Sequence, residues 1–142
     1  HRSLWGLLFT ITVQNIAFPA MAAALSLGLD APLTILLARV RIRAGKLDEA
    51  IELLEPLTKA RDDLAVAALG WTATAELARG RSNRPLRAAR RAVALDPNDP
   101  VAVYALAATL TRIGDDEAGG WVERARKLAP DAPSPDTIAR AR

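Results

Sequence analysis

Two groups of carboxylates are the side chains of this 142-residue sequence with the types and spacing for acid–base or metal chemistry. They are Asp115-Asp116-Glu117, directly after Gly114, and Asp48-Glu49, three residues after Gly45. Each group stands where a helix is expected to begin, and the helix dipole stabilises negative charge at that end. The carboxylates therefore indicate helix N-termini rather than a catalytic pair or a cation site.

The sequence lacks the side chains that most often carry catalysis. It has no cysteine, and its one histidine is His1, so neither a thiolate nor an internal imidazole is present as nucleophile, base or ligand. The four serines have no histidine beside them to activate the hydroxyl group. Phosphate-cradling glycine motifs and calcium-loop spacings are absent as well. We therefore expect no enzymatic activity, no bound metal and no cofactor.

Arginine is concentrated in one short stretch. Six of the 13 residues from Arg79 to Arg91 are arginine, and no acidic residue stands between Glu76 and Asp96. Four of them are expected on neighbouring positions of a helix that begins at Pro85: Arg84, Arg87, Arg90 and Arg91. They predict a basic patch for anionic lipid or an acidic partner, or else a solvated helix face. Nucleic acid is not expected as a partner, because the net charge is only +3 and aromatic residues make up 4%.

The first part of the chain is long, apolar and uncharged. Residues 4–29 contain no ionisable side chain, and about 20 apolar residues suffice to cross a bilayer as a helix. We therefore predict that residues 1–29 are a transmembrane segment that enters the lipid bilayer through residues 4–29. Trp5 would lie at the membrane interface, and Pro19 would kink the helix. The positions between them that we assign to the span include apolar and polar residues, namely Phe9, Gln14, Asn15 and Phe18.

Two other interpretations of this segment stay open. It could be a signal peptide with Ala20-Met21-Ala22 as its cleavage site, or a pair of buried helices broken at Phe18-Pro19 that cover the core. The side of the membrane on which the rest would lie is open too. Arg2 before the segment and the basic residues 39–46 after it argue for opposite orientations by the positive-inside rule.

From Asp30 onward the pattern is helical. Apolar residues recur at helical spacing, and no segment alternates like a strand. Turn residues and caps place helices at residues 31–44, 48–57, 64–79, 85–95, 101–113 and 116–128. Ser134-Pro135 then resembles the start of a short terminal helix. The predicted fold class is all-α.

These helices form a repeat of about 34 residues. Gly45, Gly80 and Gly114 end the first helix of each pair and lie 35 and 34 residues apart, and an alanine stands seven residues before each. A fixed period with small residues in constant register is typical of stacked helical hairpins. We expect three helix pairs in residues 30–133 and a capping helix or tail in residues 134–142.

The repeats resemble the tetratricopeptide repeat family over about residues 31–133. The resemblance rests on Gly45-Lys46-Leu47-Asp48-Glu49-Ala50-Ile51, Ala92-Val93-Ala94-Leu95-Asp96-Pro97-Asn98 and Gly114-Asp115-Asp116-Glu117-Ala118. The second repeat departs from the pattern, since Pro85 replaces a small residue in its second helix. The resemblance implies a helical-hairpin solenoid that binds proteins and whose first helices line a groove for a peptide or a helix.

Carried onto this chain, the resemblance implies nine groove-facing residues. They are Ile35, Arg39, Arg43, Thr74, Leu77, Tyr104, Ala108, Thr111 and Arg112. Three arginines and no carboxylate indicate a mildly basic groove, suited to a carboxylate or an acidic peptide. Alternatively, these residues keep an exposed helix face soluble.

The function expected from these features is that of a membrane-anchored scaffold for protein–protein interaction. It would be an accessory or assembly subunit of a bacterial inner-membrane complex, with other membrane-protein subunits as partners. One alternative is the C-terminal module of a larger multi-pass membrane enzyme such as a glycosyltransferase. Another is a soluble adaptor in which residues 4–29 fold against residues 31–44.

Overall fold

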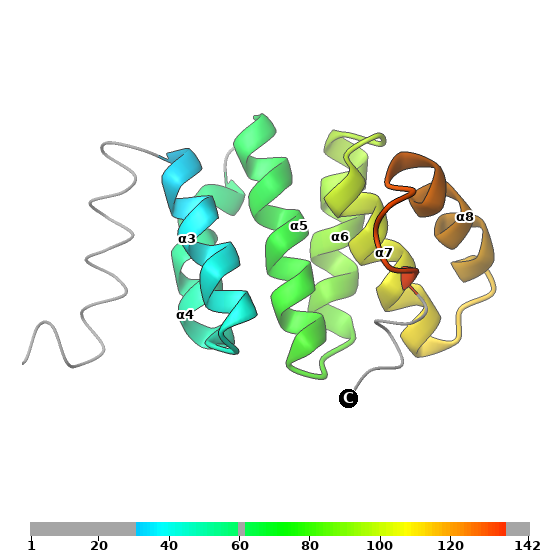
Figure 1. Cartoon of the computed structure of the whole chain (residues 1–142), viewed down its shortest axis with the longest axis horizontal. Coiled ribbons are helices and arrows are strands. Elements are labelled where there is room, and N and C mark those ends of the chain that lie inside the picture. Colours follow the sequence, from blue (N-terminus) through cyan, green and yellow to red (C-terminus); the bar gives the residue numbers. More distant parts are fainter. Residues whose placement is uncertain (1–30, 60–61, 136–142) are drawn as a thin grey trace, which may run out of the picture.

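The computed structural model describes residues 31–59 and 62–135, and this part of the chain is helical without a strand. Its elements are α3 (Ala31–Arg43), α4 (Leu47–Leu54), the 3-10 helix η1 (Glu55–Lys59), α5 (Asp63–Ala78), α6 (Asn83–Leu95), α7 (Pro100–Ile113) and α8 (Ala118–Leu128). Consecutive helices pack in pairs, α3 with α4, α5 with α6 and α7 with α8, and the pairs stand in a row (Figure 1). The all-α prediction is confirmed for these residues.

The segment predicted to cross the membrane lies outside the described residues. Residues 1–29, with Trp5, Phe9, Gln14, Asn15, Phe18 and Pro19, are therefore still a prediction, as are their two alternatives. Within residues 31–59 and 62–135, no helix has the length and apolar character needed to cross a membrane. The backbone is helical at Pro135, where a terminal helix was expected, and the residues that follow lie outside the described part.

Three glycines end α3, α5 and α7 with the same backbone turn. Gly45, Gly80 and Gly114 have φ angles of +78°, +82° and +71°, a region that costs other L-residues about 1–2 kcal/mol. In the second pair, the glycine N–H donates to Leu77 O (2.9 Å) and the next N–H, of Arg81, donates to Glu76 O (3.1 Å). Equivalent bonds close the other two turns, as in the Schellman motif. The regular spacing of the glycines in the sequence therefore corresponds to three helix ends with the same turn geometry.

Aspartates and a proline set three of the helix boundaries that differ from the prediction, and α6 begins at Asn83, two residues before the predicted start at Pro85. Asp99 Oδ2 accepts the N–H of Ala102 (2.9 Å), which caps α7 one residue earlier than predicted, with Pro100 at its first position. The second helix ends early, at Leu54, and continues as η1, because Pro56 has no N–H for an α-helical bond. Asp115 Oδ1 accepts the N–H of Glu117 (2.8 Å), so this acidic run lies in a turn and α8 begins after it.

Small residues let the first helices of the pairs lie close together. Ala38, Ala73 and Ala107, each seven residues before a turn glycine, are fully buried. At Gly70 of α5 the approach to α7 is close, since a Cβ there would stand 2.9 Å from Val101 Cγ1. As a result α3, α5 and α7 lie side by side and form one continuous face of the row.

Candidate interaction groove on the first helices

A pocket of about 470 Å³ opens on the face formed by α3, α5 and α7. All three first helices and the segment after α8 contribute to its lining: Arg43, Trp71, Thr74, Pro100, Val101, Tyr104, Ala129, Ala132 and Pro133. Apolar and aromatic side chains predominate, and Arg43 is the one charged residue among them. Such a lining, with few polar groups, is typical of binding pockets in proteins.

The segment that follows α8 forms one wall of this pocket. The hydroxyl group of Tyr104 in α7 donates a hydrogen bond to the carbonyl of Pro133 (2.5 Å), and Pro135 is fully buried. Figure 1 shows this segment, in red, crossing α7 after the end of α8. This hydrogen bond holds the segment beside α7. The segment therefore closes the pocket on a side that no helix covers.

Trp71 of α5 is held by an arginine of the neighbouring helix. The guanidinium carbon of Arg39 lies 4.8 Å from the centre of the indole ring, within the range of a cation–π interaction. Arg43 follows Arg39 by one helical turn and lines the pocket. Trp71 was not among the predicted groove residues, although it precedes Thr74 by three positions and therefore shares its helix face.

The structure brings three of the nine predicted groove residues together in the pocket, namely Arg43, Thr74 and Tyr104. Thr74 also donates its hydroxyl hydrogen to Gly70 O (2.9 Å). Arg39 lies next to the pocket against Trp71. The half-buried Thr111 bonds Ala107 O (2.8 Å) within α7 and does not line the pocket.

Three further predicted groove residues are buried, which corrects their assignment. Ile35 is 8% exposed, Leu77 3% and Ala108 1%. Leu77 and Ala108 pack against each other between α5 and α7, and Ile35 packs in the core formed with α4. The first helices α5 and α7 approach so closely that Leu77 and Ala108 cover each other, whereas α4 covers Ile35. The spacing along one helix does not reveal such contacts.

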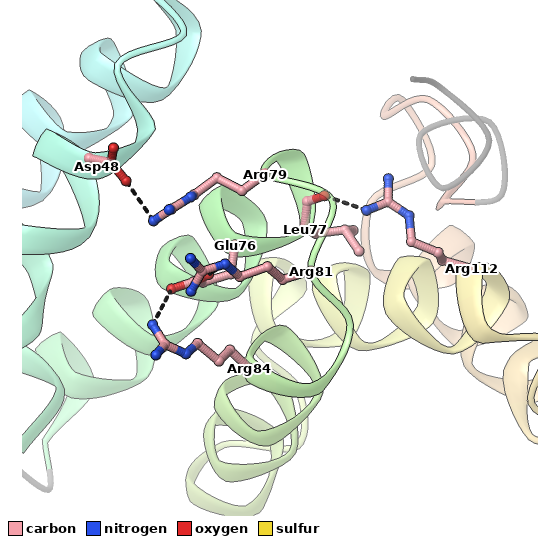
Figure 2. A network of polar contacts seen from close by, with 7 residues as sticks. All are labelled: Asp48, Glu76, Leu77, Arg79, Arg81, Arg84 and Arg112. Carbon is pink, nitrogen blue, oxygen red and sulfur yellow. Dashed lines mark hydrogen bonds and ion pairs between the residues drawn. The ribbon is translucent and has the colours of Figure 1, made fainter.

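Arg112, the last predicted groove residue, and the arginines around residue 80 form structural contacts (Figure 2). Arg112 Nη1 donates to the carbonyl of Leu77. Arg79 pairs with Asp48 of the first helix pair (2.5 Å). These contacts each join two consecutive pairs, so part of the arginine-rich stretch stabilises the stacking.

Glu76 is a buried carboxylate at the centre of the same region. It is 3% exposed, and its oxygens lie 3.6 Å from Arg81 Nε and 3.8 Å from Arg84 Nη1. Both arginines are partly exposed. The turn between α5 and α6 therefore places two cations over one buried anion.

The predicted basic patch lies on α6, the second helix of its pair. All four of its residues are exposed: Arg84, Arg87, Arg90 and Arg91. Arg84 pairs with Glu76, and Arg90 lies 3.6 Å from Glu117 in an exposed ion pair, which contributes about 0–1 kcal/mol. Among the residues that the structure describes, no ion pair involves Arg87 or Arg91, so these two are available to an external anion.

The carboxylates of Asp48 and Glu49, which were considered for acid–base or metal chemistry, form ion pairs with arginines in the structure. Asp48 pairs with Arg79, and Glu49 lies 3.4 Å from Arg41. In residues 31–59 and 62–135, no three histidine, cysteine, aspartate or glutamate side chains come together in a way that could hold a metal ion.

Comparison with known proteins gave no match for this chain among protein-family models, curated proteins or solved structures. The pocket and the repeated helix pairs are therefore the features that indicate a function.

Proposed function

We propose that this chain is a protein-interaction scaffold of the tetratricopeptide type that holds a segment of a partner protein in the pocket between α3, α5 and α7. The pocket is the observation that carries the proposal, because all three helix pairs contribute to it, with Arg43, Trp71 and Tyr104 among its lining residues. Tryptophan, tyrosine and arginine are the residue types that dominate binding energy at protein interfaces. The constant turn geometry at the three glycines supports the family assignment.

The partner segment combines an apolar side chain with a neighbouring carboxylate. Pro100, Val101 and Ala132 offer an apolar surface for the side chain. The exposed Arg43 at the pocket offers a charge-assisted hydrogen bond to a carboxylate. A volume of about 470 Å³ lies within the range of roughly 300–1,000 Å³ seen for ligand pockets.

Binding of an acidic, apolar peptide array to purified variants tests this proposal. We expect Arg43→Glu to weaken binding by tenfold or more, which corresponds to about 1.4 kcal/mol. Thr74→Trp should do the same by filling the pocket. Arg91→Glu is the matched control, since it makes the same charge change on α6. If Arg43→Glu and Arg91→Glu reduce binding equally, the pocket is not the binding site.

We also propose that the scaffold works at a bacterial inner membrane as an accessory or assembly subunit of a protein complex. The support is the uncharged stretch of residues 4–29, which only Asp30 separates from α3 in the sequence. Carbonate washing of membranes that contain the full chain should leave it in the pellet. When the full chain is purified in mild detergent, a membrane subunit should co-purify with it in stoichiometric amount. Release by carbonate, or purification without a partner, would contradict this part of the proposal.

A further inference from the structure

The second helices of the first two pairs carry opposite charges. α4 and the first residue of η1 contain no basic residue and four acidic ones, namely Asp48, Glu49, Glu52 and Glu55. α6 contains no acidic residue and four basic ones, namely Arg84, Arg87, Arg90 and Arg91. Glu49 is half-buried, and the other seven are exposed. We call these two sets the acidic stripe and the basic stripe.

The opposite charges stand at equivalent positions of the repeat. The turn glycines Gly45 and Gly80 lie 35 residues apart. The same interval separates Glu49 from Arg84, Glu52 from Arg87 and Glu55 from Arg90. Steps of three residues keep each set on one side of its helix. The acidic stripe and the basic stripe therefore lie at matching heights along the two helices.

Charges at the centre of both stripes are not neutralised within the chain. Asp48 and Glu49 pair with arginines of neighbouring helices, and Arg84 and Arg90 pair with glutamates. Among the residues that the structure describes, no ion pair involves the remaining four, namely Glu52, Glu55, Arg87 and Arg91. Each stripe thus keeps two charges that can pair with another molecule.

We infer that two copies of this chain associate through these stripes as a symmetric dimer, with α4 of each copy opposite α6 of the other. Two-fold symmetric dimers are by far the commonest closed oligomers. A two-fold axis that lies between α4 and α6 and runs parallel to them keeps the direction and the height of every helix. Glu52 of each copy then faces Arg87 of the other, and the pairs 49/84 and 55/90 follow the same rule.

A second copy fits this surface better than a bilayer or an unrelated acidic protein. An anionic bilayer would attract the basic stripe and repel the acidic stripe next to it. An acidic protein would match the basic stripe alone. A second copy is the partner that carries a complement to both stripes at the spacing required, and complementary charge is what selects a partner and fixes its register.

The dimer is weak and does not involve the proposed groove. Leu95 is the one large apolar side chain exposed on α4, η1 or α6, and exposed ion pairs contribute little individually. The dimer therefore dissociates on dilution. The groove lies on the first helices, so either proposal can fail without the other. Because the axis is parallel to the helices, α3 begins at the same end of the dimer in both copies, as two anchors in one membrane require.

Sedimentation of the full chain in mild detergent over a range of protein concentrations tests the inference. We expect a monomer–dimer equilibrium that shifts to monomer at an ionic strength of about 1 M, where the Debye length is about 3 Å. Glu52→Arg and Arg87→Glu each turn two attractive contacts into repulsive ones and should raise the dissociation constant by about tenfold or more. The double variant Glu52→Arg/Arg87→Glu restores both pairs with reversed sign, so its dissociation constant should return to within about threefold of the parent value.

The same charge changes on α8 are the matched controls. Glu123→Arg and Lys127→Glu alter exposed positions that face no helix of the second copy in this arrangement, so the dissociation constant should not change. Sedimentation as a single chain at every concentration would overturn the inference and leave the basic stripe to an anionic lipid or an acidic protein. Species larger than two chains would overturn it as well, because they indicate an open head-to-tail contact.

Cross-linking measures the register of the two copies directly, and the natural lack of cysteine keeps the background low. Chains with Glu52→Cys and chains with Arg87→Cys are mixed and treated with a short bis-maleimide. The mixed dimer keeps one Glu52–Arg87 pair and brings the two cysteines face to face, so the mixture should cross-link several times more than either variant alone. Lys127→Cys in place of Arg87→Cys is the control. Equal yields from the mixture, the single variants and the control would contradict the proposed register.

Discussion

The guanidinium group of Arg112 near the end of α7 donates a hydrogen bond to the carbonyl of Leu77 at the end of α5, 35 residues earlier in the chain. This separation is within one residue of the 34 that separate Gly80 and Gly114, so the contact joins equivalent ends of two consecutive first helices. It also places a positive charge beside the last carbonyls of α5, where the helix dipole favours a cation.

Removing this contact should destabilise the stack. We expect Arg112→Ala to lower the free energy of unfolding by about 1–3 kcal/mol, because a charge-assisted hydrogen bond to a half-buried carbonyl is lost. Urea denaturation measures the change. The exposed Arg87 provides the control, and its alanine variant should differ from the parent by less than about 0.5 kcal/mol. Equal effects of the two variants would mean that the Leu77 contact contributes nothing specific.

The buried Glu76 and its two arginines predict an asymmetry between variants. The double variant Arg81→Ala/Arg84→Ala leaves a carboxylate that is 3% exposed without its cations, and this should cost about 3 kcal/mol or more. Glu76→Gln keeps the shape and leaves two partly exposed arginines in contact with water, so we expect a smaller loss. Parallel urea titrations compare the two proteins. A larger loss for Glu76→Gln would contradict this account of the turn.

The positions of the helices could be predicted because their ends are set locally. Gly80 ends α5 through its own φ of +82°, and Asp99 begins α7 through a bond to a residue three positions away. Only the neighbours of these residues in the sequence are needed. The early end of α4 at Leu54 is set locally as well, by the missing N–H of Pro56, so the predicted helix over residues 48–57 is wrong at this boundary.

The pocket could be predicted only in part because contacts between distant segments build it. Thr74 and Tyr104 were expected on one face, and they do line the pocket. Leu77 was expected on that face too, yet Ala108 of the next repeat covers it. The wall formed by residues 129–133 depends on a bond between Tyr104 and Pro133, 29 residues apart, which no periodic pattern encodes.

Tyr104→Phe should loosen that wall without disturbing the helices. The phenyl ring keeps the packing, while the hydrogen bond to Pro133 O is lost, at a cost of about 1 kcal/mol. We expect the amide of Ala132, which donates to Ala129 O, to exchange its hydrogen several times faster. Amides in the middle of α5 should be unchanged and serve as the internal reference. Unchanged exchange at Ala132 would mean that other contacts hold the segment.

Glycine-to-alanine changes at two helical sites should have opposite effects. Alanine normally stabilises a helix by about 0.5–1 kcal/mol relative to glycine. At Gly120 in α8 nothing lies within 4 Å of the added Cβ, so we expect a gain of up to about that size. At Gly70 the Cβ would meet Val101 Cγ1 at 2.9 Å and Ala102 N at 3.4 Å. Neither the β-branched side chain of Val101 nor a backbone atom can move far. The helices α5 and α7 must therefore separate, at a cost of about 1–3 kcal/mol. Thermal denaturation of both variants measures the difference. If Gly70→Ala is as stable as Gly120→Ala, the close approach of the first helices does not limit the packing, and the small residues at this contact need another explanation.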